Sequence, residues 1–242
     1  MSDLVTMLTS TYKIAFAVLF AIIISILTLL AAPFYRTGNL FHILARIHAR
    51  ATLAVCGVRV LVEGLDHVDF NRNYVYVANH ASQFDIPSVI AGIPDQIRLV
   101  FKKELARIPV FGWALKYGRT YICIDRGSGQ DAIQSLDEAA GKIRNGASVL
   151  LFAEGTRTAD GKIQQFKRGA FSLAVRAGVP VVPLTIKGSY KILPRGSFHI
   201  RPGTITLVLG KPVMPSAPNG REAEMELRER VGKVIQQNYH SQ

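Results

Sequence analysis

Apolar residues are distributed very differently over the first quarter of the chain and over the rest of it. No charged residue occurs between Lys13 and Arg36, and the intervening run, IAFAVLFAIIISILTLLAAPF, is almost wholly apolar. A helix rises about 1.5 Å per residue, so this run can cross a hydrocarbon core about 30 Å thick. The pattern therefore predicts a membrane segment.

A cleaved signal peptide and a buried core helix are two alternatives for this run. However, the run is longer than the apolar region of a signal peptide, and the residues before it carry few charges. Cores rarely need so many consecutive apolar residues. Four arginines follow the run on its C-terminal side: Arg36, Arg46, Arg50 and Arg59. By the positive-inside rule, we expect the chain beyond the run to lie on the cytoplasmic face of the inner (cytoplasmic) membrane.

The segment after this run has a different character. Residues 40–55 combine apolar side chains with histidines and arginines, which is typical of an amphipathic helix at a membrane interface rather than of a second span. Both a bitopic and a monotopic anchor agree with this pattern. We expect residues 1–56 to form N-terminal membrane-anchoring helices.

Short β-rich runs alternate with helical patterns from residue 57 onward. The runs are VRVLVE from residue 58, YVYVAN from 74, RLVF from 98, YICI from 121, SVLLF from 148, VVPLTI from 181 and TITLVLG from 204. Helical spacing is found in residues 130–144, and residues 221–237 have the pattern of a charged surface helix. Over residues 57–242 we therefore predict an α/β fold, with a layered, mostly parallel or mixed sheet of about seven strands flanked by helices.

The composition narrows the possible partners. The 242 residues carry a net charge of +12 and are 49% apolar, which excludes a disordered chain. The two cysteines lie far apart without metal-ligand spacing, so neither a disulfide framework nor a metal site is expected. The basic excess lies in the middle of the chain and would attract nucleic acid, an anionic membrane surface or phosphorylated small molecules. Because no nucleic-acid-binding motif is present, no nucleic acid is expected among the partners.

One segment combines a histidine and a carboxylate directly after a predicted strand. It is VANHASQFDIPS, residues 77–88, with His80 and Asp85. A histidine can act as a general base near neutral pH, and a carboxylate bound to its second ring nitrogen fixes the tautomer and stabilises the imidazolium. Alternatively, Asp85 caps the next helix and His80 is an ordinary loop residue. The spacing alone leaves both interpretations open.

Three further strand ends carry charged residues. SVLLF is followed by Ala153 and then by Glu154-Gly155-Thr156-Arg157, in which the glycine permits a tight turn and the arginine offers a planar fork for phosphate oxygens. RLVF is followed by Lys102, and YICI is followed closely by Arg126. Each alone is commonly a solvated surface charge. Together they predict one anion site built by several loops, and no ATP-binding phosphate loop accompanies it.

Four short blocks occur in a set order along the chain. They are N-H-A-S-Q-F-D-I, I-C-I-D-R, F-A-E-G-T-R and V-V-P-L. In this order they resemble the blocks of the glycerolipid acyltransferase family, in particular the 1-acylglycerol-3-phosphate acyltransferases, over roughly residues 57–212. Two positions depart from the family pattern, because Cys123 replaces the usual phenylalanine and Ala153 the usual proline. Both changes affect packing or loop stiffness more than charge, so they bear on substrate detail.

The resemblance implies a catalyst that moves a fatty acyl group from a thioester to the free hydroxyl of lysophosphatidic acid, giving phosphatidic acid. The donor would be acyl-CoA or acyl carrier protein, and no cofactor is implied. His80 would be the general base and Asp85 its orienting carboxylate, without an acyl-enzyme. The phosphate and glycerol of the acceptor would bind the following residues: Lys102, Arg126, Glu154, Gly155, Thr156 and Arg157. Pro183, in the fourth block, is associated with the donor side and with packing.

Other functions remain possible at this stage. The acceptor could be another lyso-lipid, such as lysophosphatidylglycerol or a lyso-aminolipid. A non-catalytic protein that binds membrane lipid would keep the basic surface and the anchor but would not need His80 and Asp85 together.

The segment IPVFGWALKYG, residues 108–118, is apolar on one face. Core packing explains such a face, and the alternative is an acyl-chain pocket walled by Phe111, Trp113 and Leu115.

Overall fold

The computed structural model describes residues 2–35, 38–118, 122–124, 130–217 and 220–241. The strands are β1 (Val58–Glu63), β2 (Val75–Ala78), β3 (Ile97–Lys102), β4 (Ile122–Ile124), β5 (Ser148–Phe152), β6 (Val181–Lys187) and β7 (Gly203–Leu209). The α-helices are α1 (Ser2–Ala31), α2 (Asn39–Cys56), α3 (Asp85–Gly92), α4 (Phe111–Tyr117), α5 (Gln130–Arg144), α6 (Gly169–Ala177), α7 (Ser189–Ile192) and α8 (Arg221–His240). Two short 3-10 helices, η1 (Leu65–His67) and η2 (Lys103–Arg107), complete these elements.

The seven strands form one sheet in the order β1-β7-β6-β2-β5-β3-β4. Neighbouring strands are parallel, with the exception of the antiparallel pair β6 and β7. The predicted α/β class, with a mixed and mostly parallel sheet, is therefore confirmed. Because β2, β5, β3 and β4 run in the same direction, their carboxyl ends meet at one edge of the sheet, where functional sites of α/β proteins commonly lie.

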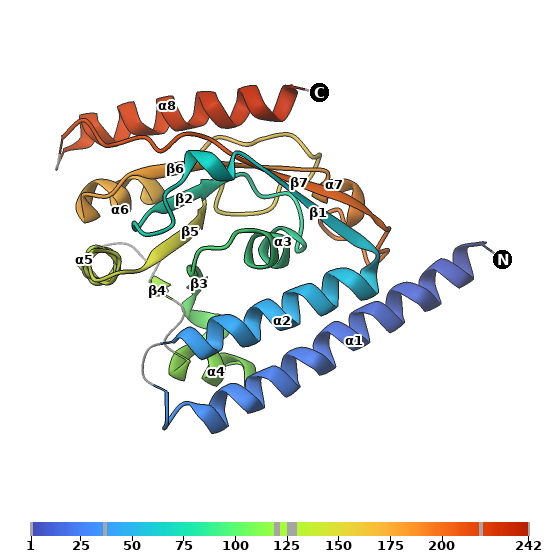
Figure 1. The fold of residues 1–242 in the computed structure, drawn as a ribbon. Helices are drawn as coiled ribbons and strands as arrows, with labels where there is room; N and C mark the ends of the chain where they lie inside the picture. Colours follow the sequence, from blue (N-terminus) through green and yellow to red (C-terminus); the bar gives the residue numbers. More distant parts are fainter. Residues whose placement is uncertain (1, 36–37, 119–121, 125–129, 218–219, 242) are drawn as a thin grey trace.

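Alternating side chains of β2 anchor two cores, one on each face of the sheet. Val75 and Val77 pack into a cluster with apolar residues of α5, α6 and α8. Tyr76 and Ala78 point to the opposite face, into a cluster that includes residues of α2 and α3. Figure 1 shows α5, α6 and α8 on one side of the sheet, and α3, followed by α2, on the other. A strand buried on both faces in this way is held rigidly, and so is the loop that follows it.

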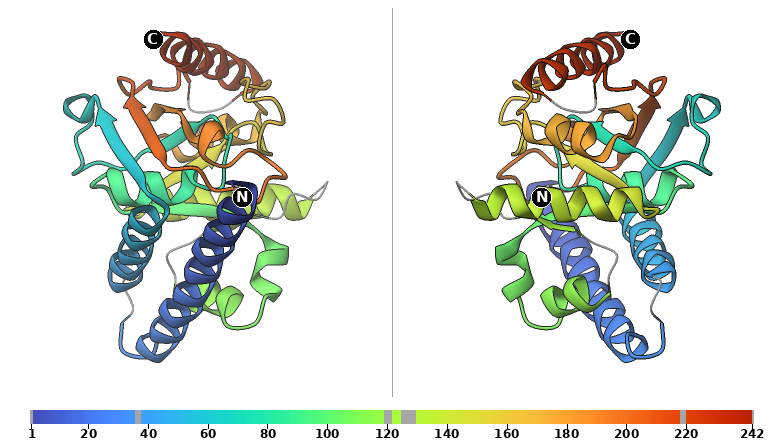
Figure 2. Two further views of the ribbon diagram at one scale, coloured as in Figure 1. Left: turned by 90° about the vertical axis from the view of Figure 1, so that its right-hand side faces the viewer. Right: turned by 90° about the vertical axis from the view of Figure 1, so that its left-hand side faces the viewer.

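Helix α1 lies at the margin of the second core, which its partly buried Ile14 contacts. It packs against α2 and α4, and near its start the Ile200 N–H donates to Ser10 Oγ (3.0 Å). Figure 2 shows α1, α2 and α4 projecting together from the α/β layers. Within Val5–Ala31 an 18-residue window has a mean hydropathy of 3.0, so by length and composition α1 could cross a membrane. Few of these residues are buried, which argues against a core helix and is compatible with membrane association.

A glycine terminates α2 and turns the chain into the sheet. Gly57 adopts a left-handed conformation (φ 71°), and its N–H reaches back to the carbonyl oxygen of Ala54. A Cβ atom at this position would lie 3.1 Å from Cβ of Pro202. Both the φ angle and the close approach therefore require glycine between α2 and β1.

Candidate active site

The residue that follows β2, Asn79, is held in place because its side chain forms hydrogen bonds with the backbone of β6. The Asn79 amide donates to the carbonyl oxygen of Ile186 (2.9 Å) and accepts from the N–H of the same residue (2.8 Å). Both groups are buried, so these hydrogen bonds are shielded from water. His80 follows directly, at the carboxyl edge of the sheet.

His80 and Asp85 form a hydrogen-bonded pair. The distance between His80 Nδ1 and Asp85 Oδ2 is 2.7 Å. The same carboxylate oxygen accepts the N–H groups of Ala81 (2.8 Å) and Ser82 (2.9 Å). The Asp85 side chain is fully buried at the start of α3, whereas 15% of the His80 side chain is exposed. The predicted pairing of these two side chains is present, and the carboxylate also holds the loop that carries the histidine.

This geometry defines which ring nitrogen of His80 can act as a base. An ionised carboxylate only accepts hydrogen bonds, so Nδ1 carries the proton and donates it to Asp85. Nε2 is then the basic nitrogen. The Phe152 ring stacks on the imidazole, with centroids 3.9 Å apart and planes inclined by 17°, and so restricts its rotation. A base that is oriented on two sides, by a carboxylate and by an aromatic face, is suited to accepting a proton from a bound hydroxyl.

Glu154 joins the loop after β5 to the backbone of His80. Its Oε1 accepts the His80 N–H (2.7 Å) and its Oε2 accepts the Gln164 N–H (3.0 Å). In the other direction, the Thr158 N–H donates to the carbonyl oxygen of His80 (2.9 Å). Burial raises the pKa of Glu154, although the two backbone N–H groups favour its ionised form. The carboxylate thus fixes the loop relative to His80, a role that sequence analysis did not assign to it.

The turn at Gly155 brings a further cation beside the loop. Gly155 has a φ of 75°, and a Cβ atom there would lie 3.0 Å from Lys167 Nζ. Lys167 is anchored by its N–H, which donates to the carbonyl oxygen of Ala153 (2.7 Å). Thr156 is exposed and Arg157 is half-buried. Two cationic side chains, those of Arg157 and Lys167, therefore belong to one short loop.

Three side chains from later in the chain hold the same loop by its carbonyl oxygens. Arg195 Nη1 donates to the carbonyl of Arg157 (3.1 Å). The Tyr190 hydroxyl donates to that of Ala159 (2.9 Å), and the Tyr239 hydroxyl donates to that of Gly161 (2.5 Å). Burial raises the pKa of Tyr239, and the negative charges of Glu154 and Asp85 raise it further, so this tyrosine lies close to the site. We call Tyr190, Arg195 and Tyr239 the loop clamp.

The structure brings together most of the predicted site residues. Glu154 and Thr158 connect the E-G-T-R loop to His80 and Asp85. Lys102 ends β3 at the same edge of the sheet, but its side chain lies outside what the structure describes, and Arg126 lies outside the described residues altogether. Sequence analysis missed Phe152, Lys167 and the loop clamp. Phe152 could have been found, because it directly precedes the A-E-G-T-R segment.

The residues predicted for an acyl-chain pocket lie on α4. Phe111 and Trp113 are exposed, and Leu115 is half-buried. Helix α4 packs against α1 and η2. The assignment of these three residues to an acyl-chain pocket stays a prediction.

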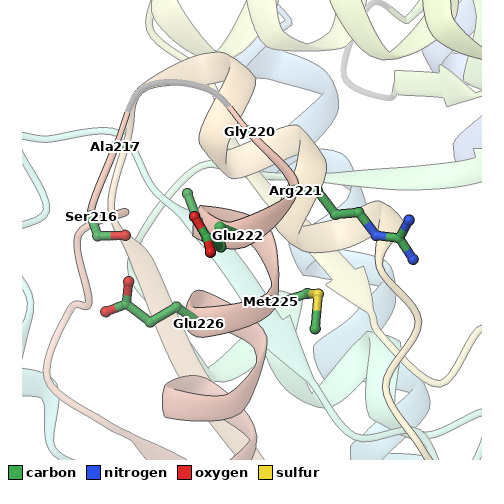
Figure 3. A pocket seen from close by; sticks show the side chains of 8 residues that line it. Ser216, Ala217, Gly220, Arg221, Glu222, Met225 and Glu226 are labelled. Carbon is green, nitrogen blue, oxygen red and sulfur yellow. The ribbon is translucent and has the colours of Figure 1, made fainter.

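A hollow elsewhere on the surface does not belong to this site. It lies at the start of α8 and is lined by residues that include Ser216, Arg221 and Glu226 (Figure 3). Helix α8 has 20 residues and is therefore about 30 Å long. Tyr239, near its other end, reaches the E-G-T-R loop, so the length of α8 separates the hollow from His80.

The fold and this site together define a mixed α/β protein equipped for acid–base chemistry beside a cationic loop. The family model named Acyltransferase matches residues 59–187, which is more than half of the chain. The chain therefore belongs to the acyltransferase family. The matched range includes His80, Asp85 and the whole E-G-T-R loop.

Individual relatives and a solved structure agree with this membership. The chain is 31% identical over 204 residues to a chloroplastic 1-acyl-sn-glycerol-3-phosphate acyltransferase of Brassica napus, covering 81% of this chain and 58% of that protein. It is 35% identical over 181 residues to a 1-acyl-sn-glycerol-3-phosphate acyltransferase of Pseudomonas aeruginosa, covering 74% of this chain and 68% of that protein. The chain spans somewhat more than half the length of the plant relatives.

The structural comparison covers nearly the entire chain. The crystal structure of the 1-acyl-sn-glycerophosphate (LPA) acyltransferase PlsC from Thermotoga maritima matches with a TM-score of 0.83 at 28% identity. The match covers 98% of this chain and 96% of that chain. The N-terminal helices are thus part of an architecture that both proteins share.

Proposed function

We propose that this protein transfers an acyl group from an acyl thioester to the free hydroxyl of 1-acyl-sn-glycerol-3-phosphate, giving phosphatidic acid. The observation that carries the proposal is the hydrogen bond between His80 and Asp85, held against a loop that presents Arg157 and Lys167. The printed names of the relatives support the same acceptor. Acyl-CoA and acyl carrier protein are both candidates for the donor.

The reaction needs one proton carrier and no covalent intermediate with the protein. His80 Nε2 takes the proton of the acceptor hydroxyl while the oxygen of that hydroxyl attacks the carbonyl carbon of the thioester. The tetrahedral intermediate collapses with loss of the thiolate, and the imidazolium returns the proton to the sulfur. Asp85 stabilises the imidazolium through the 2.7 Å hydrogen bond. General-base help of this kind contributes about 100-fold to 10,000-fold.

Ser82 is not suited to act as a nucleophile in this reaction. Its side chain is fully buried, its hydroxyl donates to the carbonyl oxygen of Leu193 (2.9 Å), and it accepts the Phe84 N–H (3.2 Å). These two hydrogen bonds direct the Ser82 hydroxyl into the protein, so its oxygen is not exposed to a thioester. Direct attack by the acceptor hydroxyl is therefore the pathway that the geometry favours.

The acceptor phosphate would bind the cationic loop and the adjacent strand end. A phosphate carries about −1.5 to −2 charges at neutral pH, and Arg157 can bind two of its oxygens at once. We place Gly155 and Thr156 beside the glycerol phosphate and assign Lys102 and Arg126 to the same group. Glu154 would act through the two backbone N–H groups that it holds. Charge-assisted bonds of this kind position the hydroxyl next to His80.

We further infer that residues 1–56 anchor the protein and that residues 57–242 form the acyltransferase domain. Helix α1 is apolar enough for this role, and a lipid substrate is most accessible at a bilayer surface. The arginines that follow α1 favour the cytoplasmic face of the inner membrane. The basic loop residues would attract anionic lipid to the same face.

An acyl-transfer assay with two donors tests the proposal. The full-length protein is offered lysophosphatidic acid with acyl-CoA or with acyl carrier protein, and the parent is compared with His80→Ala. We expect phosphatidic acid with at least one donor and a loss of about 100-fold or more in the variant. Exchange of the exposed His199 for alanine is the matched control and should leave the rate unchanged.

The remaining outcomes discriminate among the alternatives. Transfer to lysophosphatidylglycerol or to a lyso-aminolipid, but not to lysophosphatidic acid, would support the proposed acyl transfer. It would refute lysophosphatidic acid as the acceptor. Lipid binding that survives in His80→Ala, with no transfer by the parent to any lyso-lipid, would point to a non-catalytic binding protein instead.

A further inference from the structure

Several large apolar side chains are exposed on η2, on α4 and on the short link between them, outside the site described above. They are Leu105, Ile108, Phe111, Trp113 and Tyr117, with exposed fractions from 36% for Phe111 to 55% for Tyr117. Single exposed apolar residues are common on protein surfaces, whereas a group of five within residues 105–117 more often marks a binding surface. We call this group the α4 face.

The α4 face is continuous with the apolar surface of α1. Helix α4 packs directly against α1, and a Cβ atom on Gly118 would lie 3.3 Å from side-chain atoms of both Thr28 and Phe41. The end of α4 therefore sits between α1 and α2. Both views in Figure 2 place α4 beside the C-terminal half of α1, where Ile26 and Leu30 are also exposed.

The chemistry of the α4 face fits a lipid bilayer better than a protein partner. Tryptophan and tyrosine are enriched where a membrane meets water, because their rings combine an apolar body with a polar atom. Lys116 lies on the same helix, with Nζ 5.6 Å from the Tyr117 ring centroid. Lysines can extend their ammonium groups toward lipid head groups while their stems stay apolar. A partner that covers the α4 face must also lie beside α1, which is long and apolar enough to cross a membrane.

We propose that η2 and α4 form a second lipid-contacting surface, which rests in an anionic bilayer beside α1. The proposal depends on the membrane association proposed above. Its consequence concerns orientation, because interfacial tryptophan, tyrosine and lysine side chains help to set how an apolar helix is tilted and rotated in the bilayer. The α4 face would add such anchors to the contacts of α1 and α2. Since η2 follows directly on Lys102, the contact fixes the carboxyl edge of the sheet relative to the bilayer surface.

This proposal differs from an acyl-chain pocket at the same residues. Phe111 and Trp113 are too exposed to enclose a single chain on their own, whereas bulk lipid would cover them from outside. The two possibilities predict different responses to a labelled acyl donor and to labelled bilayer lipid.

Fluorescence of Trp113 tests the proposal directly, because it is the only tryptophan in the chain. The full-length protein is reconstituted into vesicles of phosphatidylcholine and phosphatidylglycerol, with increasing fractions of lipids brominated on the acyl chains. We expect quenching that rises with the brominated fraction and weak quenching by iodide present on both sides. Strong quenching by iodide without quenching by brominated lipid would overturn the proposal. Protection from both quenchers would instead indicate burial between two copies of the chain and would overturn it as well.

A second titration in unbrominated vesicles separates the bilayer from the acyl-chain pocket. Brominated acyl-CoA is added, followed by an excess of unbrominated acyl-CoA. Saturable quenching that the competitor reverses would assign Trp113 to an acyl-chain pocket and contradict the lipid surface. Acyl transfer is measured in the same vesicles, so a failed fluorescence test with intact transfer refutes the α4 contact alone.

A double variant tests the consequence for catalysis. Ile108→Ser with Tyr117→Ser removes apolar area from the α4 face without touching the His80 site. We expect a several-fold lower rate on acceptor embedded in vesicles and an unchanged rate on a short-chain, water-soluble acceptor. Met225→Ser, which alters an equally exposed side chain on α8, should change neither rate. An equal loss on both acceptors in the double variant would show a disturbed active site and count against the proposal.

Discussion

The groups that position His80 are joined by hydrogen bonds within the chain, whereas along α1 and α4 large apolar side chains are exposed. The carboxylates of Asp85 and Glu154 are each held by backbone N–H groups. Among the residues that the structure describes, nothing covers the exposed side chains of Phe111, Trp113 and Tyr117 on α4 to a comparable degree. The protein thus positions its catalytic groups with its own hydrogen bonds, while the exposed apolar side chains of α1 and α4 are the ones to which we assign contact with lipid.

This contrast predicts two kinds of sensitivity to mutation. Hydrogen bonds are directional, so the loss of one atom near His80 leaves a buried group unsatisfied. Apolar contact depends on buried area, so changes on α1 and α4 should act gradually and roughly in proportion to the area removed.

Replacing Asp85 by asparagine should give the largest loss. The amide keeps the size of the side chain but removes the charge that stabilises the imidazolium, and it can place an NH2 group against the donors of Ala81 and Ser82. We expect kcat to fall by about 100-fold to 10,000-fold. The measurement is the rate of acyl transfer at saturating acceptor, alongside circular dichroism. The exposed Asp137, changed to asparagine, is the control, and a rate in Asp85→Asn close to that of the control would refute the assigned role.

The strands and the His80–Asp85 pair could be predicted because their signals are local. The helix from Gln130 to Arg144 and the strand from Ser148 to Phe152 have the predicted bounds, since apolar spacing and neighbouring glycines mark them. His80 and Asp85 lie five residues apart, His80 in the loop after β2 and Asp85 at the first residue of α3. Their pairing therefore depends on short-range geometry that a sequence pattern can indicate.

The remainder of the site depends on contacts between distant parts of the chain. Glu154 binds the backbone N–H of His80, which lies 74 positions earlier in the sequence. This contact depends on the order of the strands in the sheet, which no single segment of the sequence predicts. The helix predicted over residues 221–237 was too short, because α8 continues to His240. Tyr239 therefore fell beyond the predicted end, and no local signal distinguishes it from an ordinary surface tyrosine.

The buried side chain of His42, on α2, should make the free energy of unfolding depend on pH. It is buried on α2 beside Arg46, whose guanidinium also caps α3 through the carbonyl oxygens of Ile90 (3.1 Å) and Ile93 (2.7 Å). Burial, and to a smaller degree the charge of Arg46, lower the pKa of His42 to about 4, although a hydrogen bond with the Asp95 backbone opposes the shift. The folded protein therefore holds the neutral imidazole.

The sign of the effect follows from the lowered pKa. The unfolded chain takes up a proton near pH 6.5, whereas the folded chain takes it up only near pH 4. The contribution of His42 is thus complete above pH 6.5 and is lost as the pH falls toward 4, by roughly 2 to 3 kcal/mol in total. The stability of the parent relative to His42→Gln should decrease over this range, as measured by thermal unfolding in one detergent. A difference that stays constant from pH 7 to pH 4.5 would contradict this account, and the exposed His199, changed to glutamine, should show no such trend.

Removing one hydroxyl from the loop clamp should have the smallest of these effects, and it should change the KM for only one of the two substrates. Tyr239→Phe keeps the ring and deletes the hydrogen bond to the carbonyl oxygen of Gly161. A single neutral hydrogen bond is worth about 0.5 to 1.5 kcal/mol, so a loop that is less well positioned should raise the KM for lysophosphatidic acid by about 2-fold to 10-fold. The KM for the acyl donor should stay unchanged, because the clamp touches only the loop that is assigned to the acceptor.

Steady-state kinetics with each substrate varied in turn measure this difference. Tyr12→Phe alters an exposed tyrosine on α1 and is the matched control, with no change expected in either KM. If Tyr239→Phe raised both KM values or lowered kcat alone, the hydroxyl would serve general stability or the base rather than the acceptor loop. A selective rise would show that the last turn of α8, at the far end of the chain from the anchor, sets the position of the loop that receives the lipid phosphate.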